Sequence, residues 1–259
     1  MNYLHNRNIA VRRTPGPISS VLLQSFPDLV ASFDEVEPTY QDIGFTGLIS
    51  PTWKEVEILH LLVKHAAPSN VLDIGTGIGW AAAHLAMGLP EKGVVTCVDP
   101  FTQNARGLGG TNLDIMERLS SNLKRAHLSK VCVITPTESP AILSEIAPEG
   151  GWDLVFFDGW PQDDQPKRDI EGVLPFVNPK TVFVIRNHRS PDVYAATQDL
   201  VKLQTTKGAQ QWHFTGFITR SHLAVFMQGV YQEKGENKYP KWWDKFNDEV
   251  NTVFRNAGE

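Results

Sequence analysis

Three alternate glycines, Gly75, Gly77 and Gly79, stand directly after an apolar run. The run, residues 71–74, is typical of a buried strand, and residues 81–87 are typical of a helix. A strand, a glycine turn and a helix in this order let a ligand approach bare backbone at the positive end of the helix. Glycine turns after strands also occur for purely structural reasons, so the turn by itself only indicates where a ligand could bind.

The glycine spacing and a nearby acid discriminate between nucleotide ligands. A dinucleotide fingerprint needs Gly-x-Gly-x-x-Gly, and its last position here is Trp80. Asp73 stands two residues before the first glycine. A carboxylate at that place suits a ligand that carries an amino group and would repel a pyrophosphate. The pattern therefore favours S-adenosylmethionine over NAD as the cofactor.

A second acid, Asp99, follows the apolar run at residues 94–98 and lies twenty-four residues after Gly75. In a strand–helix–strand unit this spacing places Asp99 beside the glycine turn, where a carboxylate can accept both hydroxyls of a ribose. The alternative is a surface acid at a strand end, with Pro100 as a turn former. Because the glycine turn is correctly placed upstream, we favour the ribose role.

Length and composition suit an enzyme built on one α/β domain with terminal additions. The chain has 259 residues, of which 41% are hydrophobic, and its formal net charge is −5. The sequence has no cluster of basic residues typical of nucleic-acid binding, and no apolar run approaches membrane-spanning length. The N-terminus lacks a signal-peptide pattern. The two cysteines, Cys97 and Cys132, are expected to be buried free thiols. We expect a cytoplasmic location and a small-molecule partner, with no nucleic-acid or membrane partner; a homodimer is left open.

Apolar runs and amphipathic stretches alternate along the chain, which indicates a parallel sheet with helices on both faces. The first helix is expected to start at Ser50 and Pro51, with Ser50 as N-cap. The expected strands are residues 71–74, 94–99, 131–135, 152–158 and 181–185, and residues 211–219 and 222–228 are expected to form a hairpin. Further helices are expected at residues 81–87, 112–126, 141–146, 165–174 and 194–205.

These segments together resemble the class I S-adenosylmethionine-dependent methyltransferases, and more narrowly the small-molecule O-methyltransferases related to the catechol and caffeoyl-CoA enzymes. The resemblance covers roughly residues 47–228 and rests on residues 49–51, 71–80, 89–93 and 152–160. It implies an α/β, Rossmann-like fold. Its sheet would have seven strands, mainly parallel, with one antiparallel strand near the C-terminal edge and helices on both faces.

The resemblance also implies residue roles. Asp73 and Gly75 would hold the methionine end of the cofactor, Asp99 would hold the ribose, and Trp160 would pack near the adenine. The expected cofactor-binding residues are Asp73, Gly75, Thr76, Gly77, Gly79, Trp80, Asp99, Pro100, Thr137, Glu138, Asp158 and Trp160.

Two departures from these relatives concern the reaction. Metal-dependent members hold a divalent cation with an acid after the fourth strand and an Asp-Asn pair after the fifth. Here Asp158 and Asn187 match the first and last ligands, but Arg186 stands between them, and a guanidinium cannot ligate a metal. Pro161 stands where the catechol enzymes have a catalytic lysine. We therefore expect no metal, and an ion pair between Arg186 and Asp158 instead.

Methyl transfer is an in-line displacement, so the protein must align the nucleophile and remove its proton where needed. His188 suits the role of general base, because a histidine can accept a proton near neutral pH. The expected catalytic residues are His188, Arg186, Asn187 and Asp158. Alternatively, His188 is a solvated loop residue, and Asp163, Asp164 or His213 supplies the base. Asp163 and Asp164 could also simply cap the following helix.

Three parts of the chain are distinguished: an N-terminal lid or oligomerisation segment (residues 1–48), a cofactor-binding α/β domain (49–229) and a C-terminal helical extension (230–259). The extension carries an apolar face with Trp242, Phe246, Val250 and Val253, for which we favour packing on the domain or a second subunit over a lid.

The leading function is metal-independent methylation of a small molecule, with O-methylation preferred. The alternative is a natural-product enzyme that keeps the cofactor fold but catalyses a cyclisation or an elimination. A non-catalytic assembly role is disfavoured by the presence of Asp73, Gly75 and Asp99.

Overall fold

A computed structural model describes the chain over residues 16–26, 51–101, 112–129, 132–207, 212–217, 223–228, 232–233, 236–237 and 239–256. The expected N-cap Ser50, most of the segment 1–48, and the side chains of His213 and Val253 lie outside what is described.

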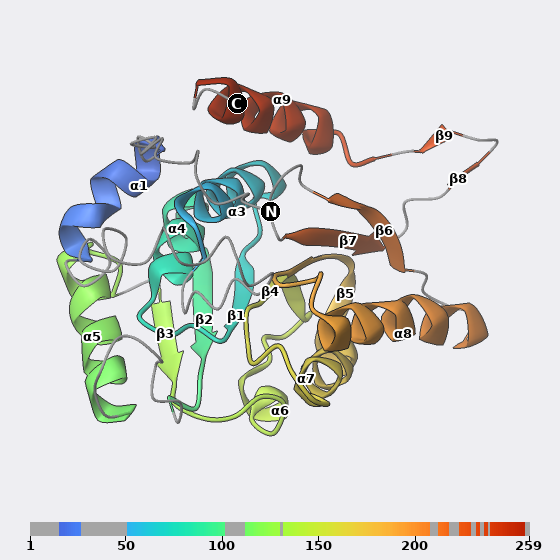
Figure 1. The fold of residues 1–259 in the computed structure, drawn as a ribbon, viewed down its shortest axis with the longest axis horizontal. Helices are drawn as coiled ribbons and strands as arrows, with labels where there is room; N and C mark the ends of the chain where they lie inside the picture. The colour runs from blue at the N-terminus through green and yellow to red at the C-terminus, as the bar shows by residue number, and fades with distance from the viewer. Residues whose placement is uncertain are drawn as a thin grey trace, which may run out of the picture.

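Within these residues, one mixed sheet has the strand order β3-β2-β1-β4-β5-β7-β6 (Figure 1). The strands are β1 Asn70–Ile74, β2 Val94–Val98, β3 Cys132–Thr135, β4 Trp152–Phe157, β5 Val177–Ile185, β6 Trp212–Phe217 and β7 Ala224–Gln228. Strands β1 to β5 pair in parallel, and β7 is antiparallel to both β5 and β6. The expected α/β class is confirmed. The short pair β8 (Gln232–Glu233) and β9 (Glu236–Asn237) was not predicted.

Strand β5 begins four residues earlier than its apolar run, at Val177 instead of Thr181. The added residues are mostly polar or proline, so they carry no apolar periodicity. They are held instead by the side chain of Asn178, which donates to the backbone oxygen of Trp152 at 3.1 Å.

Helices cover both faces of this sheet (Figure 1). One face carries α3 (Trp53–Ala66), α4 (Trp80–Gly88) and α5 (Asn112–Arg125). The other face carries α6 (Leu143–Ile146), α7 (Gln165–Val173) and α8 (Pro191–Lys207). Short 3₁₀ turns, η1 (Leu23–Ser25) and η3 (Leu174–Phe176), follow α1 (Pro17–Leu22) and α7. The two layers of helices make two apolar cores, one on each side of the sheet. Cys97 and Cys132 are buried free thiols, as expected.

Helix α3 begins at Trp53, and its N-cap is Thr52. Thr52 and Glu55 form a capping box: the Glu55 amide donates to Thr52 Oγ1 at 3.4 Å, and the Thr52 amide donates to Glu55 Oε2 at 2.8 Å. The expected start at Ser50 and Pro51 is therefore wrong. The Thr-x-x-Glu spacing is a stronger start signal than serine followed by proline, because it satisfies two backbone donors at once.

The C-terminal extension forms helix α9 (Trp242–Asn256), which lies along α3 (Figure 1). Its apolar face is buried: Phe246 is 0%, Val250 4% and Trp243 7% exposed. Trp242 is only partly buried, so its neighbour Trp243 supplies the larger buried indole. The favoured packing of this segment on the domain is confirmed. Because α9 covers α3 from outside, nearly every residue of α3 is buried.

Candidate cofactor and catalytic site

The carboxyl ends of β1, β2, β4 and β5 lie side by side and bring the expected site residues together. Backbone hydrogen bonds continue past the strands: Gly75 donates to Val98 at 2.9 Å, Asp158 to Ile74 at 2.8 Å and Arg186 to Phe157 at 3.0 Å. In parallel sheets ligands bind at this edge. Residues 75, 99, 158 and 186 therefore surround one place on the protein.

The glycine turn needs glycine at the first and last of its three positions. Gly75 and Gly79 have φ of 85° and 89°, in the region that side chains disfavour. A Cβ on Gly75 would lie 2.4 Å from the backbone oxygen of Asp158, and one on Gly79 would lie 2.4 Å from Leu119 Cδ1. The turn therefore packs tightly against β4 on one side and α5 on the other. It leads into α4 at Trp80 without a side-chain cap.

Asp73 is fully buried at the end of β1. Among the described residues, neither of its carboxyl oxygens has a hydrogen-bond partner. Burial raises the pKa of Asp73 to about 8, and the carboxylates of Asp158 and Asp99 add to the shift. A buried carboxyl without a partner destabilises the protein unless a ligand satisfies it. The residue therefore fits a ligand that brings an amino group.

Asp99 lies beside the glycine turn, as expected. Its Oδ2 accepts from the amide of Gly77 at 2.9 Å, and its Oδ1 accepts from the amide of Phe101 at 2.7 Å. Burial raises its pKa, although the side chain keeps a partly exposed edge. A carboxylate offers about four acceptor positions, so two remain for hydroxyl groups. The ribose role stays a prediction that this geometry permits.

A buried ionic triad occupies the ends of β4 and β5. Arg186 Nη1 lies 2.8 Å from Asp158 Oδ1, and Arg186 Nε lies 3.4 Å from Glu55 Oε2. All three side chains are at most 4% exposed. The expected pair between Arg186 and Asp158 is confirmed. Burial, the largest effect, raises the pKa of Asp158 to about 7 even though the guanidinium opposes the shift.

Glu55 is the triad member that the sequence analysis missed. It lies 131 positions before Arg186, at the third position of α3. The capping box with Thr52 fixes the start of α3. Because Glu55 stands in this first turn, its carboxylate is directed toward the sheet edge. The Thr-x-x-Glu pattern was the available signal for this placement.

His188 and Asn187 lie in the turn that follows β5. His188 is only 5% exposed, so the alternative of a solvated loop residue is wrong. Asn187 has φ of 56°, which asparagine tolerates better than most residues, and its carbonyl accepts from the Ser190 amide at 2.7 Å. Ser190 Oγ donates to the Pro161 carbonyl at 3.0 Å. This bond ties the turn after β5 to the loop after β4.

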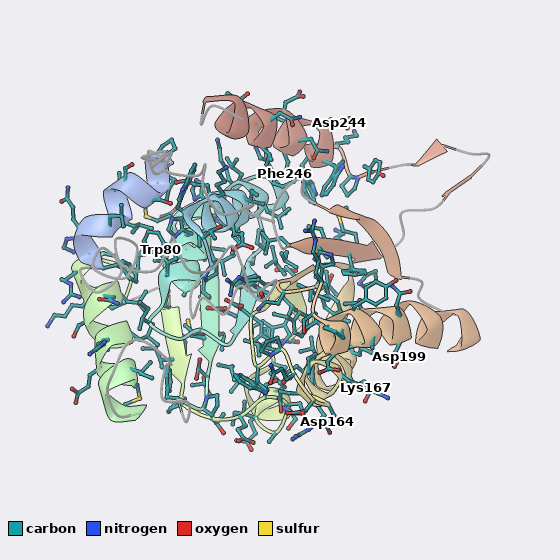
Figure 2. The ribbon with its side chains drawn as sticks, viewed as in Figure 1. Trp80, Asp164, Lys167, Asp199, Asp244 and Phe246 are labelled. Atoms are coloured by element: carbon teal, nitrogen blue, oxygen red, sulfur yellow. The ribbon has the colours of Figure 1, made fainter. Side chains whose placement is uncertain are left out.

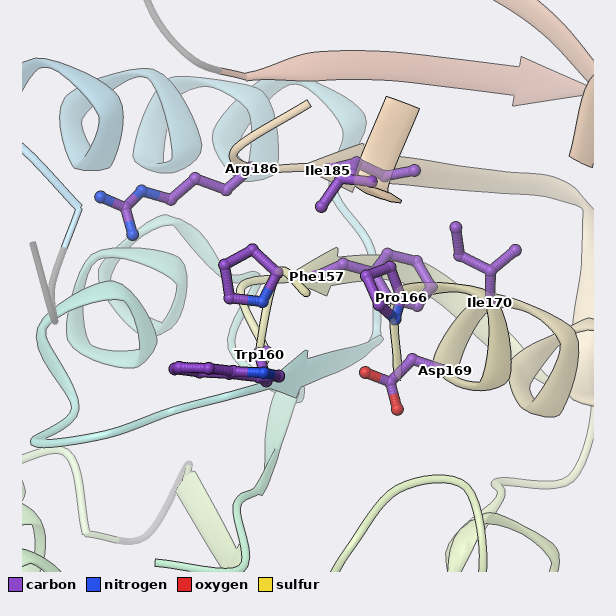
Figure 3. Close-up of a pocket in the computed structure, with 10 residues that line it drawn as sticks. Phe157, Trp160, Pro166, Asp169, Ile170, Ile185 and Arg186 are labelled. Atoms are coloured by element: carbon purple, nitrogen blue, oxygen red, sulfur yellow. The ribbon is translucent and has the colours of Figure 1, made fainter. Parts of the chain in front are cut away.

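A small pocket opens beside Trp160, between the ends of β4 and β5 and helices α7 and α8 (Figure 3). Its walls include Trp160, Pro166 and Ile170, while the Arg186 side chain points away from Asp169. Asp169 is 4% exposed and accepts from Gln165 Nε2 at 2.7 Å. Burial raises its pKa to about 7. The burial of Asp169 could not be predicted from the sequence, because an acid within an amphipathic helix is ordinarily a solvated residue.

Other expected cofactor residues differ in how far their side chains can reach a ligand. The Trp80 ring is buried against Phe26 and His84, with ring centroids 5.2 Å and 4.3 Å away, so only its backbone is left to contact a cofactor. Thr137 is half-buried and Glu138 is exposed in the segment after β3. Thr76 Oγ1 donates to the Asp73 carbonyl at 3.1 Å, which stiffens the turn, and Pro100 directly follows Asp99.

The two acids before α7 do not cap that helix with their side chains. Asp164 stands at the N-cap position but makes no side-chain cap hydrogen bond. Asp163 has φ of 62°, and its amide donates to Asp192 Oδ2 at 3.0 Å. The capping interpretation is therefore not supported.

Residues 72–188 match the family model of a methyltransferase domain. This match includes the glycine turn, Asp99 and the ionic pair of Asp158 and Arg186, and it confirms the methyltransferase class expected from the sequence. No curated protein matches the sequence significantly. Within the described residues, no helix is long and apolar enough to cross a membrane.

Solved methyltransferases share the fold. The O-methyltransferase from Bacillus cereus in complex with SAH is 18% identical, with a TM-score of 0.56 over 81% of this chain and 93% of that chain. TomG from Streptomyces achromogenes, an O-methyltransferase involved in tomaymycin synthesis and solved in complex with SAM, is 16% identical, with a TM-score of 0.56 over 83% of this chain and 90% of that chain. At these identities the likeness is one of fold.

Proposed function

We propose that this chain is an S-adenosylmethionine-dependent methyltransferase that methylates an oxygen of a small molecule without a divalent metal. The observation that carries the proposal is Asp73, a fully buried carboxyl with no hydrogen-bond partner among the described residues, next to a glycine turn. The strand order with antiparallel β7 supports the seven-stranded class I methyltransferase fold. The two O-methyltransferases of the same fold, solved with SAH or SAM, support the cofactor and the acceptor atom.

The residues present fit the cofactor. Asp73 would pair with its amino group, and the bare backbone from Gly75 to Gly79 would allow close approach. Asp99 would accept from the ribose hydroxyls while keeping its two backbone hydrogen bonds. Thr137, Glu138 and Trp160 would flank the base. When bound, the cofactor supplies an electrophilic methyl group on a positively charged sulfur.

Metal independence rests on the cation that the chain itself supplies. Arg186 lies within hydrogen-bond reach of both Asp158 and Glu55. A metal at Asp158 would have to displace or approach this guanidinium, whose fixed charge repels it. The same ion pair holds the Asp158 carboxyl in place at the sheet edge.

Two side chains compete for the role of general base. His188, with Arg186 and Asn187 placing the substrate, is our first choice, because it follows β5 directly at the ligand-binding edge. Asp158 is the second, because its pKa of about 7 lets it accept a proton near neutrality. The non-methylating alternative gains no support from the comparisons.

Mass spectrometry of the purified chain with S-adenosylmethionine and pools of hydroxylated small molecules tests the proposal. We expect products heavier by one methyl group, equimolar S-adenosylhomocysteine, and unchanged turnover after exhaustive chelation. Product formation without consumption of the cofactor, or turnover that requires added magnesium, would contradict it.

Substitution separates the two candidate bases. His188→Ala should lower kcat by about 10²- to 10⁴-fold, leave cofactor affinity nearly unchanged and remove the acid limb of the pH–rate profile. If this variant turns over at the parent rate while Asp158→Asn loses the acid limb, Asp158 is the base.

A further inference from the structure

The N-terminal segment 16–26 packs against α3, α4 and α5 (Figure 1). It contains α1, η1 and Phe26. Phe26 is 0% exposed and packs edge-on against Trp80, with ring centroids 5.2 Å apart and planes at 71°. Trp80 immediately follows Gly79 and is the first residue of α4. The segment therefore contacts the helix that the turn leads into.

Buried hydrogen bonds hold α1 in this position. The amide of Ser19 donates to Glu57 Oε1 at 2.6 Å, and Ser19 Oγ lies 2.9 Å from His84 Nε2. His84 Nδ1 lies 2.9 Å from the Trp80 carbonyl, so Nδ1 must carry the proton and Nε2 must accept from Ser19. Burial lowers the pKa of His84 to about 3, which keeps the ring neutral and this arrangement intact.

A second connection runs from the same segment through α5 to the turn itself. Arg125 Nε donates to the Ser25 carbonyl at 3.0 Å, and the Arg125 guanidinium also donates to Asn122 Oδ1. Asn122, which is 0% exposed, donates from Nδ2 to the carbonyl of Ile78 at 3.0 Å. Ile78 lies between the second and third glycines of the turn. Two independent chains of contacts thus link segment 16–26 to residues 78–80.

We propose that Phe26 and Asn122 are positioning residues for the cofactor turn, so that segment 16–26 fixes the conformation of residues 75–80 from behind. This inference rests on the proposed function for its binding readout, because it treats the turn as the cofactor seat. A glycine turn has wide conformational freedom when nothing restrains it, and ordering it on binding opposes affinity. The Phe26–Trp80 and Asn122–Ile78 contacts restrain it in advance.

A matched pair of variants tests the proposal, because Phe246 is also 0% exposed but packs between α9 and α3 (Figure 2). Trp80 and Phe246 lie in different regions of the molecule. Phe26→Ala should weaken S-adenosylhomocysteine binding by roughly 5- to 150-fold, the usual range for coupled sites. Phe246→Ala should leave this affinity within about twofold while lowering the melting temperature comparably. Calorimetry well below both melting temperatures measures the affinities.

Hydrogen–deuterium exchange of residues 75–83 supplies a readout that does not need a ligand. Exchange there should be faster in Phe26→Ala than in the parent, and unchanged in Phe246→Ala. If Phe26→Ala does not fold, Phe26→Leu and Asn122→Asp replace it; the latter keeps an acceptor for Arg125 but loses the donor to Ile78.

Equal affinities in the two variants, or equal exchange at residues 75–83, would overturn the inference. If the parent protein itself fails to bind S-adenosylhomocysteine, the proposed function fails. The exchange comparison then decides the positioning role by itself.

Discussion

Asp73 and Asp158 both lie near the carboxyl ends of two neighbouring strands, β1 and β4, but their carboxyl groups differ in their hydrogen-bond partners. Both carboxyls are buried, and burial raises their pKa values to about 8 and about 7. Asp158 receives a hydrogen bond from Arg186 at 2.8 Å. Asp73 has no partner among the described residues.

The difference separates what the chain supplies from what a ligand must supply. At Asp158 the balancing cation belongs to the protein, at the position where the resemblance to metal-dependent methyltransferases implies a metal ligand. At Asp73 the balancing group has to come from outside, and an amino group is the chemistry that fits. In our proposal the glycine-turn half therefore binds the cofactor, whereas the β4–β5 half carries its own cation, Arg186.

The largest effect is expected from removing the built-in cation. Arg186→Met removes the cation beside the buried carboxylates of Asp158 and Glu55 and should lower the free energy of unfolding by about 3–5 kcal/mol. Urea denaturation measures it. Lys167→Met is the control, because Lys167 is 52% exposed and its contacts with Glu171 and Asp199 are 3.9 Å and 4.0 Å long. That surface change should alter stability by less than about 1 kcal/mol. If the two substitutions lowered the free energy of unfolding equally, the claim that the triad stabilises the buried carboxylates would be contradicted.

The next effect concerns the carboxyl without a partner. Asp73→Asn should weaken cofactor binding by about 1.5–3 kcal/mol, the scale for a hydrogen bond to a charged group. It should not destabilise the protein, because it removes a buried acid. Calorimetry and thermal unfolding measure the two quantities. Asp164→Asn, at the N-cap position of α7, is the control for loss of a carboxyl outside the glycine turn. An Asp73→Asn variant with parent affinity would contradict the assignment.

The smallest loss of stability is expected from a change in the capping box that Thr52 and Glu55 form at the start of α3. Thr52→Ala removes the side-chain acceptor of the capping box and should lower stability by about 1 kcal/mol. Glu55 still has Arg186 as a partner, so catalytic rates should change little. A large loss of turnover in this variant would show that the position of Glu55 depends on the cap more than on the ion pair.

Local signals made much of this architecture predictable. The apolar runs, the glycine turn, Asp73 near the end of β1 and Asp99 after β2 can each be recognised from a few consecutive residues. Parallel strand order then brings their ends together. These signals predict the placement of Asp73 and Asp99, whereas the Arg186–Asp158 pair is predicted from the resemblance to metal-dependent methyltransferases.

Contacts between distant segments were not predictable in the same way. Glu55 reaches Arg186 across 131 positions, and Phe26 reaches Trp80 from a short helix that carries no strong pattern. The pKa of Asp169 depends on burial between α7 and the segment after β3, which no local pattern reveals. The start of α3, in contrast, could be predicted from the sequence, because Thr52 and Glu55 have the capping-box spacing.

Proton release on cofactor binding tests the central claim most directly. In the free protein Asp73, with a pKa of about 8, is mostly protonated at pH 7, whereas pairing with an amino group requires the ionised form. Binding affinity should therefore rise as pH increases toward 8 and level off above it. Calorimetric titration of S-adenosylhomocysteine at pH 7, in two buffers of different ionisation enthalpy, should show net release of protons from the protein on binding. Asp73→Asn should abolish that release, and equal proton release in the parent and the variant would contradict the account.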